Sequence, residues 1–230
     1  MGRTGDEHVR EWAELHLTEP PEGFVGGWLR AAAAVARPLA RAGISPNAVT
    51  VAALIAALAA VPPAAYVGGW LGPAAACLAI TVSGLLDALD GAVAVQAGRT
   101  TKVGFLLDSA LDRIADAAFP ATLVLVAGPD TTTIALAVAA TAACWYLEYV
   151  RARATLASDP GAQVITPGER PTRIVLAAVG CGLPFLATAT LWASAVIVGG
   201  SAVYLLAHSI RRLSRLDAAA APPDRPAPTG

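Results

Sequence analysis

The chain contains 230 residues, 56% of them hydrophobic and only 14% charged, and its formal net charge is −1. The mean hydropathy of +0.58 exceeds what an ordinary water-soluble domain sustains, so we expect an integral membrane protein and no nucleic acid among its partners. Because alanine-rich soluble helical proteins also reach such values, the prediction of a membrane protein rests on the individual segments.

The chain opens with a polar leader, residues 1–23, which has no apolar stretch of the kind found in signal peptides. Residues 24–42 then combine apolar and aromatic side chains with Arg30, Arg37 and Arg41. This pattern predicts an amphipathic helix that lies in the membrane interface.

Apolar segments follow, and the last is long enough to cross ~30 Å of hydrocarbon twice. The expected fold is therefore an all-α integral membrane protein with six transmembrane helices, preceded by the interfacial helix. Prolines at Pro62, Pro63 and Pro120 are expected to kink the helices that contain them. The segments are roughly 47–68, 72–95, 104–127, 131–150 and 173–207, the last broken near "TATLW".

The basic residues predict the orientation. All 16 Lys and Arg residues fall on one side of this arrangement, whereas the opposite connections, "VGGWLG", "AGPDTTT" and "TATLW", hold none. By the positive-inside rule, both termini face the cytoplasm, as in a multi-pass protein of the plasma membrane. Residues 24–215 are taken as one membrane domain, and residues 216–230, rich in Pro and Ala, as a disordered tail.

Acidic residues are concentrated around the connection between the second and third expected spans. Asp87 and Asp90 are three residues apart, and Asp108, Asp112 and Asp116 repeat every four residues, so each set shares one helix face. Both sets belong at the cytoplasmic end, where a cluster of carboxylates in a poorly solvated setting needs a cation. An all-oxygen site suits a hard divalent ion such as Mg²⁺ or Mn²⁺.

Ion pairing and ion transport are two alternative roles for these acids. Asp108 and Asp112 can pair with Arg99, Lys102 or Arg113 at a wet helix end, which accounts for single residues but not for the whole array. An ion- or proton-coupled transporter also uses intramembrane acids. The placement of these acids at one interface, away from the middle of the membrane, argues against a transporter.

The spacing of acids and small residues resembles a known signature. The pattern Asp87-x2-Asp90-Gly91-x2-Ala94-x9-Gly104-x3-Asp108-x3-Asp112 resembles DxxDGxxAR…GxxxDxxxD of the CDP-alcohol phosphatidyltransferases. The stretch "GISPNAVTV" is also similar to the opening of that family's first span, and the resemblance covers about residues 30–215. One position departs from the signature, because Val95 stands where the family usually has Arg.

The resemblance implies a metal site and a catalytic base. In that family the signature acids hold a pair of divalent ions on the diphosphate of a CDP-linked lipid, and the last of them takes the proton of the acceptor alcohol. The matching metal ligands here are Asp87, Asp90, Asp108 and Asp112. Asp112 would then also be the general base.

The resemblance further implies a site for CDP-diacylglycerol. Its residues would be Gly91, Ala94, Arg99 and Gly104. Small residues beside the acids leave room for a bulky ligand. Val95 removes an Arg that would donate to the nucleotide phosphates, and Arg99 or Lys102 is expected to replace it.

The expected acceptor is a small phosphorylated alcohol. "EYVRARA" followed by "GERPTR" resembles the Y-x-K-A-R…E-R-x-x-R arrangement of actinobacterial phosphatidylinositol phosphate synthases, with Arg151 where Lys is more usual. This resemblance implies inositol 1-phosphate as acceptor, phosphatidylinositol phosphate and CMP as products, and a homodimer. The residues expected to bind the acceptor phosphate are Arg151, Arg153, Arg170 and Arg173. Positive-inside topology alone could also account for these arginines, and glycerol 3-phosphate or a catalytically silent paralogue are the alternatives for function.

Overall fold

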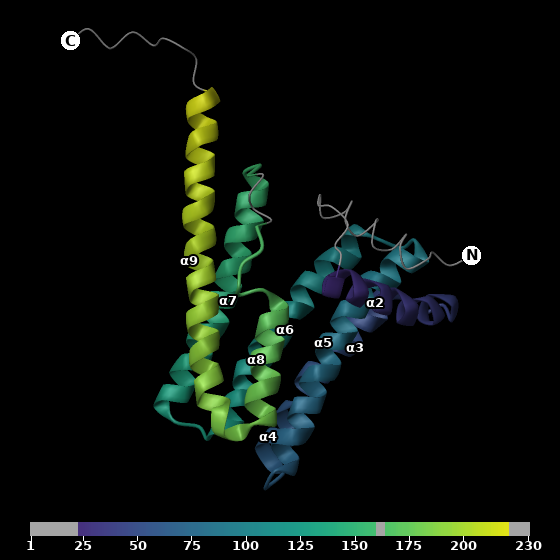
Figure 1. Ribbon diagram of the computed structural model, residues 1–230, viewed down its shortest axis with the longest axis vertical. Coiled ribbons are helices and arrows are strands. Elements are labelled where there is room, and N and C mark those ends of the chain that lie inside the picture. Colours follow the sequence, from purple (N-terminus) through teal and green to yellow (C-terminus); the bar gives the residue numbers. More distant parts are fainter. Residues whose placement is uncertain (1–22, 160–163, 221–230) are drawn as a thin grey trace, which may run out of the picture.

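The computed structural model describes residues 23–159 and 164–220, and all regular structure in these ranges is helical (Figure 1). The expected all-α fold is thereby confirmed for the described part of the chain. Residues 1–22 of the leader and 221–230 of the tail lie outside the described residues. The elements are α2 (Gly23–Arg41), α3 (Pro46–Leu58), α4 (Val61–Tyr66), α5 (Leu71–Ala97), α6 (Lys102–Ala127), α7 (Thr131–Leu156), α8 (Arg170–Gly182), the 3₁₀ turn η1 (Pro184–Leu186) and α9 (Ala187–Ala220).

Four stretches within the described residues are long and apolar enough to cross a membrane. They are Pro46–Tyr66, Leu71–Ala97, Thr131–Leu156 and Pro184–Ala219. Of the six expected spans, the other two correspond to α6 and α8. α6 has 26 residues but carries several charged side chains in its first half, and α8 has only 13 residues, about 20 Å of helix.

Prolines set the breaks in the first and the last apolar segments. The first segment divides into α3 and α4, with Pro62 and Pro63 in the first turn of α4. The last segment breaks at η1, which begins at Pro184, whereas the expected break at "TATLW" falls inside the first turns of α9. The reason is that Pro184 has no backbone N–H with which to continue α8, while the threonines of "TATLW" are compatible with a helix. α9 also continues past the expected domain boundary at residue 215.

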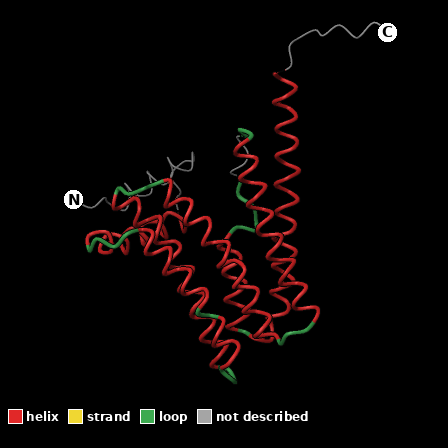
Figure 2. The backbone as a smooth tube through the Cα atoms, turned by 180° about the vertical axis from the view of Figure 1, so that it is seen from behind, coloured by secondary structure: helices red, strands yellow, loops and turns green. Residues whose placement is uncertain are grey.

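The helices form a bundle whose two ends differ. α9 runs along α7, α3 runs along α5, and α8 lies between these pairs (Figures 1 and 2). α2 crosses the bundle near the amino-terminal end of α3, where Ala32 and Ala36 are buried in one cluster with Val49 and Val93. The helix expected over residues 24–42 is therefore present, and it packs on α3 and α5.

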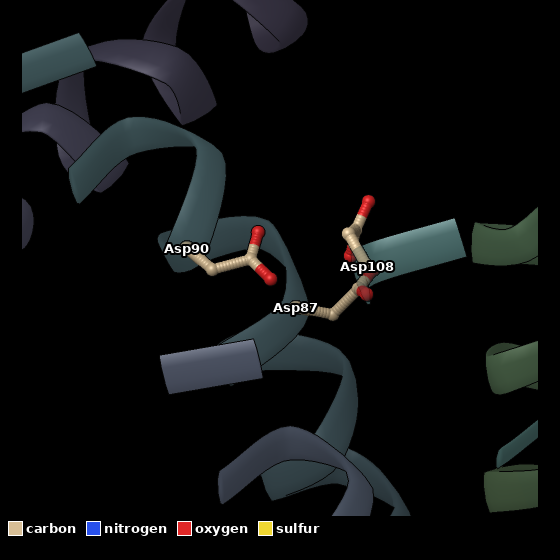
Figure 3. A group of neighbouring side chains, drawn as sticks. All are labelled: Asp87, Asp90 and Asp108. Atoms are coloured by element: carbon tan, nitrogen blue, oxygen red, sulfur yellow. The ribbon is translucent and has the colours of Figure 1, made fainter. Parts of the chain in front are cut away.

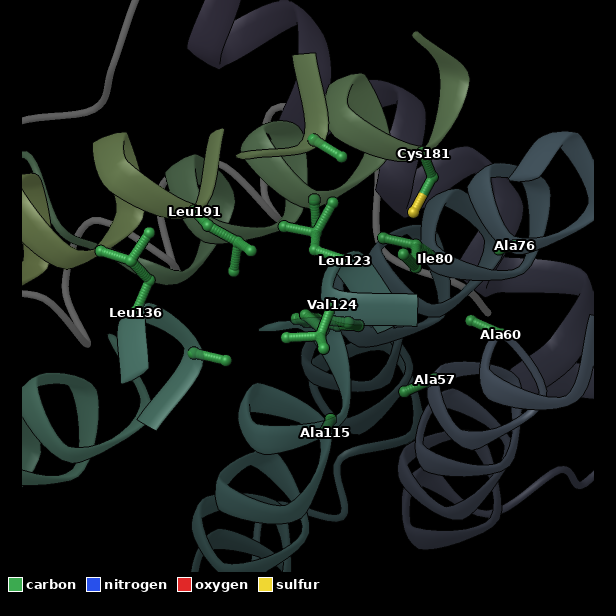
Figure 4. Packing of buried hydrophobic residues seen from close by; sticks show 14 residues of the cluster. Ala57, Ala60, Ala76, Ile80, Ala115, Leu123, Val124, Leu136, Cys181 and Leu191 are labelled. Atoms are coloured by element: carbon green, nitrogen blue, oxygen red, sulfur yellow. The ribbon is translucent and has the colours of Figure 1, made fainter. Parts of the chain in front are cut away.

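The main apolar core lies in the half of the bundle that contains η1 and the connection from α4 to α5 (Figure 4). Ile80, Phe119, Leu123 and Leu191 are buried there, surrounded largely by alanines such as Ala57. Small side chains allow helices to approach closely, and van der Waals packing is the main attraction between helices in lipid. Packing in this half holds the helices together. The polar groups of α5 and α6 lie in the opposite half, toward the connection between these two helices.

A tight turn between α4 and α5 depends on Gly72. A Cβ on Gly72 would overlap the carbonyl oxygen of Val67 and lie 2.6 Å from that of Pro63. We expect Gly72→Ala to destabilise the protein by about 1–3 kcal/mol, because backbone must move to relieve the overlap. Thermal unfolding in detergent, followed by circular dichroism, measures the effect.

Gly200→Ala is the matched control, since a Cβ on Gly200, within α9, meets nothing within 4 Å. This exchange should be neutral or stabilise by up to about 1 kcal/mol, because alanine is the better helix former. Equal melting temperatures for the two variants would contradict the packing argument.

Candidate active site

Three carboxylates meet where α5 ends and α6 begins. Asp87 and Asp90 lie on the second half of α5, and Asp108 lies on the first half of α6. One carboxylate oxygen of each lies within 4.8 Å of the others, and the side chains point toward one another (Figure 3). The helical spacing that placed Asp87 and Asp90 on one face therefore brings them to a common point with Asp108.

Asp90 is held by a residue of α3. The Thr50 hydroxyl donates a hydrogen bond of 2.7 Å to Asp90 Oδ2, and both residues are buried. α3 reaches this position because Ser45 caps it, accepting a hydrogen bond from the Ala48 N–H at 3.2 Å, with Pro46 as its first residue. Thr50 has no role among the residues expected from the sequence, although it lies in the stretch "GISPNAVTV" that carries part of the family resemblance.

Asp112 joins the cluster through Arg170, the first residue of α8. The Arg170 guanidinium lies 3.1 Å from Asp87 Oδ1 and also contacts Asp112 Oδ1. Glu169, the residue before α8, fixes this helix start by accepting hydrogen bonds from the N–H and hydroxyl of Thr166, both at 2.9 Å. The fourth signature acid lies outside the group of three carboxylates and is linked to Asp87 by the Arg170 cation.

The carboxylate cluster fits a divalent cation. Ligand oxygens that lie about 2.0–2.6 Å from one ion are at most about 5 Å from each other, and the three carboxylates satisfy this limit. The cluster consists of carboxylates alone, with neither His nor Cys in it, which favours Mg²⁺ or Mn²⁺ over softer metals.

A cavity of about 280 Å³ opens beside the acids, between α3, α5 and the start of α6. The four residues given above as the CDP-diacylglycerol site, Gly91, Ala94, Arg99 and Gly104, all line this cavity. A Cβ on Gly104 would lie 3.1 Å from both Asn47 Oδ1 and Thr101 Oγ1, so a larger residue there would narrow the cavity. The lining residues are Pro46, Asn47, Thr50, Asp90, Gly91, Ala94, Arg99, Thr100, Thr101, Gly104, Phe105 and Asp108.

The four arginines expected at the acceptor site have different surroundings. Arg170 contacts the acid cluster. Arg151 forms an ion pair of 2.7 Å with Glu169 and donates to the carbonyl of Val164 at 3.1 Å. Arg153 is exposed near the end of α7, whereas Arg173 is buried.

Glu148 and Asp116 are the acids nearest to Arg173. Arg173 lies 3.4 Å from Asp116 Oδ1 and 3.7 Å from Glu148 Oε1. Arg113 also contacts both acids, at 3.2 Å and 3.3 Å. Glu148 additionally lies 3.7 Å from Arg151.

The fold and the site define a helical membrane protein with a candidate divalent-metal site beside a cavity. Residues 43–209 match the CDP-alcohol phosphatidyltransferase family, and the chain belongs to this family. It is therefore a phospholipid-synthesis transferase, as expected from the sequence.

Phosphatidylinositol phosphate synthase of Mycolicibacterium smegmatis is 32% identical over 193 residues, which make up 77% of this chain and 82% of that enzyme. Archaetidylinositol phosphate synthase of Aeropyrum pernix is 43% identical over 94 residues, 41% of this chain and 46% of the archaeal protein, so that match spans less than half of its length.

Solved structures of one related enzyme share the fold. The crystal structure of phosphatidylinositol phosphate synthase PgsA1 of Mycobacterium tuberculosis with CDP-DAG bound is 27% identical, with a TM-score of 0.61 over 80% of this chain and 94% of that chain. A second structure of the same enzyme, in complex with manganese and citrate, also has a TM-score of 0.61 at 27% identity, over 78% of this chain and 88% of that chain.

The candidate metal site predicts a graded loss of Mn²⁺ affinity. Asp90→Asn removes a charge from the candidate ligand set and should weaken Mn²⁺ binding by more than tenfold, while Thr50→Val removes only the hydrogen bond to Asp90 and should weaken it about tenfold. Electron paramagnetic resonance of Mn²⁺ titrated into purified protein measures both.

Asp130→Asn serves as the control, because Asp130 caps α7 and lies in the connection from α6 to α7. Asn is an equally good helix cap, so Mn²⁺ affinity should stay at the wild-type value. Unchanged affinity in Asp90→Asn would show that the ion binds elsewhere.

Proposed function

We propose that this protein transfers the phosphatidyl group of CDP-diacylglycerol to inositol 1-phosphate, producing phosphatidylinositol phosphate and CMP. The observation that carries the proposal is the convergence of Asp87, Asp108 and Asp112 with Arg170 beside the cavity. The related enzymes named phosphatidylinositol phosphate synthase, one of which binds CDP-DAG in its crystal, support the same substrates.

The metal ligands in this proposal are Asp87, Asp90, Asp108 and Asp112. Their oxygens would hold two Mg²⁺ or Mn²⁺ ions, and the manganese-bound structure of the related enzyme supports a divalent ion. When bound, such ions neutralise the diphosphate and stabilise charge on the attacking and leaving oxygens.

The cavity is the proposed site of the cytidine diphosphate group. Gly91, Ala94 and Gly104 line it with little side-chain bulk. Arg99, in the connection after α5, adds a positive charge to the lining. The Val95 side chain is buried and offers no donor, so Arg99 takes the place of the arginine that the family usually has there. The acyl chains of the lipid can stay in the bilayer while the head group reaches the acids.

Arg170 is the proposed main contact of the acceptor phosphate, because it is the expected arginine that lies against the acids. Arg151 and Arg153, at the end of α7, are proposed to add positive charge on the same side. A guanidinium presents several donors in one plane, which suits a phosphate better than a point charge does.

Asp112 is the proposed general base. Its carboxylate takes the proton of the acceptor hydroxyl, whose oxygen forms a bond to the phosphorus that carries the diacylglycerol. The bond from that phosphorus to the bridging oxygen breaks, and CMP leaves with this oxygen. Arg170, in contact with Asp112, would hold the acceptor so that its hydroxyl faces this carboxylate.

The proposal includes a membrane arrangement. We propose six spans, with α6 and α8 as the two that are shielded by their neighbours, and α2 in the membrane interface. The site and both termini would face the cytoplasm of the plasma membrane, since the connections near the site carry the arginines. Residues 24–215 would form this membrane domain, and two copies would associate as a homodimer.

CMP release by purified protein in liposomes tests the reaction. With CDP-diacylglycerol and Mg²⁺, we expect release with inositol 1-phosphate and little with inositol, serine or glycerol 3-phosphate. Asp112→Asn should lower kcat by at least about a hundredfold, because the amide accepts no proton. Release with glycerol 3-phosphate alone would reassign the acceptor, and no release with any alcohol would overturn the proposal.

A second experiment tests the role given to Arg99. Arg99→Ala should raise KM for CDP-diacylglycerol about tenfold, as expected for the loss of a charge-assisted contact. Lys102→Ala is the matched control, since Lys102 lies outside the set of cavity-lining residues, and its KM should stay within about twofold of wild type. Equal effects of the two substitutions would refute the assignment.

A further inference from the structure

We infer that Asp116 and Arg173 form a positioning pair that sets the place of Arg170, and that Arg173 does not itself bind the acceptor phosphate. The inference rests on the function proposed above and refines its acceptor site. It assigns Asp116, which lies outside the signature acids, a part in the reaction.

Asp116 and Arg173 repeat the contact between Asp112 and Arg170 one turn further along both helices. Asp116 follows Asp112 by four residues on α6, and Arg173 follows Arg170 by three residues on α8. α6 and α8 are thus joined by successive ion pairs, one at the acid cluster and one deeper in the bundle.

The deeper pair is enclosed by protein. The Asp116 side chain is 0% exposed and that of Arg173 is 7% exposed, and the Cys144 thiol donates to Asp116 Oδ2 at 3.3 Å. The cavity that Asp116 and Arg173 help to line has a volume of about 20 Å³, which is too small for a sugar phosphate. Arg173 is therefore poorly placed to meet a soluble substrate.

The neighbouring charges are balanced without a ligand. Asp116, Glu148 and Glu169 together face Arg113, Arg151 and Arg173, so three acids match three arginines contributed by α6, α7 and α8. In this cluster the Arg173 guanidinium pairs with acids of its own chain.

Ion pairs of this kind fix the relative placement of helices better than apolar contacts do. Buried pairs often contribute little net stability, since both partners lose their hydration. They do, however, admit only one register, and a slip of α8 by one turn would move Arg170 by about 5.4 Å, away from Asp87 and Asp112. The pair between Asp116 and Arg173 thereby keeps Arg170 at the acids.

A mutant cycle with separate KM values tests the inference. Asp116→Asn and Arg173→Gln should each raise KM for inositol 1-phosphate by roughly tenfold, because each leaves one buried charge unpaired and displaces Arg170. KM for CDP-diacylglycerol should stay within about twofold, since neither residue lines the cavity. The double variant, which removes both charges, should recover to within about threefold of wild type.

Other results would overturn the inference. If Arg173 bound the acceptor directly, Asp116→Asn would leave the acceptor KM unchanged, and the double variant would stay as impaired as Arg173→Gln. If the pair were only structural, the variants would lower the melting temperature and the active fraction while both KM values stayed at wild type.

Failure of the proposed function is recognised separately, as wild-type protein that releases no CMP with any acceptor. The melting temperatures of the four proteins then still test the pair. Each single variant should lower the melting temperature and the double variant should recover it, and strictly additive losses would show that the residues do not act together.

Discussion

The repulsion among the carboxylates of α5 and α6 is the constraint on which the rest of the site depends. Two unit charges about 4 Å apart repel by about 4 kcal/mol at an effective dielectric constant of ~20, and three such groups lie within 4.8 Å of one another. The chain offsets part of this cost with its own groups, a hydroxyl from α3 and a guanidinium from α8. Four helices therefore converge on one point, and any one of them that moved would leave a charge uncompensated.

The spacing of residues along single helices predicted much of the site. The intervals from Asp87 to Asp90 and from Asp108 to Asp112 follow the helix repeat, so sequence alone places each pair on one helix face. Four of the cavity-lining residues, Gly91, Ala94, Arg99 and Gly104, were predictable because they stand within about one turn of these acids or in the short connection.

Contacts between distant segments were not predictable in this way. Thr50 is 40 residues from Asp90, and no periodicity links them. The break in the last apolar segment was predicted near "TATLW" but occurs at Pro184. Both stretches are possible helix breakers, and only the proline removes a backbone donor. α6 shows a related limit, since charges that face the bundle interior lower the apparent hydropathy of a helix that its neighbours shield.

The arginines on either side of the connection from α7 to α8 could serve membrane topology or substrate binding, and the sequence does not decide between these two roles. Their surroundings in the structure separate the two roles. A residue retained only for membrane topology needs to be on the right side and exposed, as Arg153 is. The side chains of Arg151, Arg170 and Arg173 are only 15%, 11% and 7% exposed, and burial of a guanidinium is unfavourable unless acids meet it. Positive-inside topology alone would therefore suffice to explain Arg153 but not the other three. Among those three, the partners decide: Glu148 and Glu169 hold Arg151, Asp116 and Glu148 hold Arg173, and only Arg170 shares its carboxylates with the acids proposed to do the chemistry.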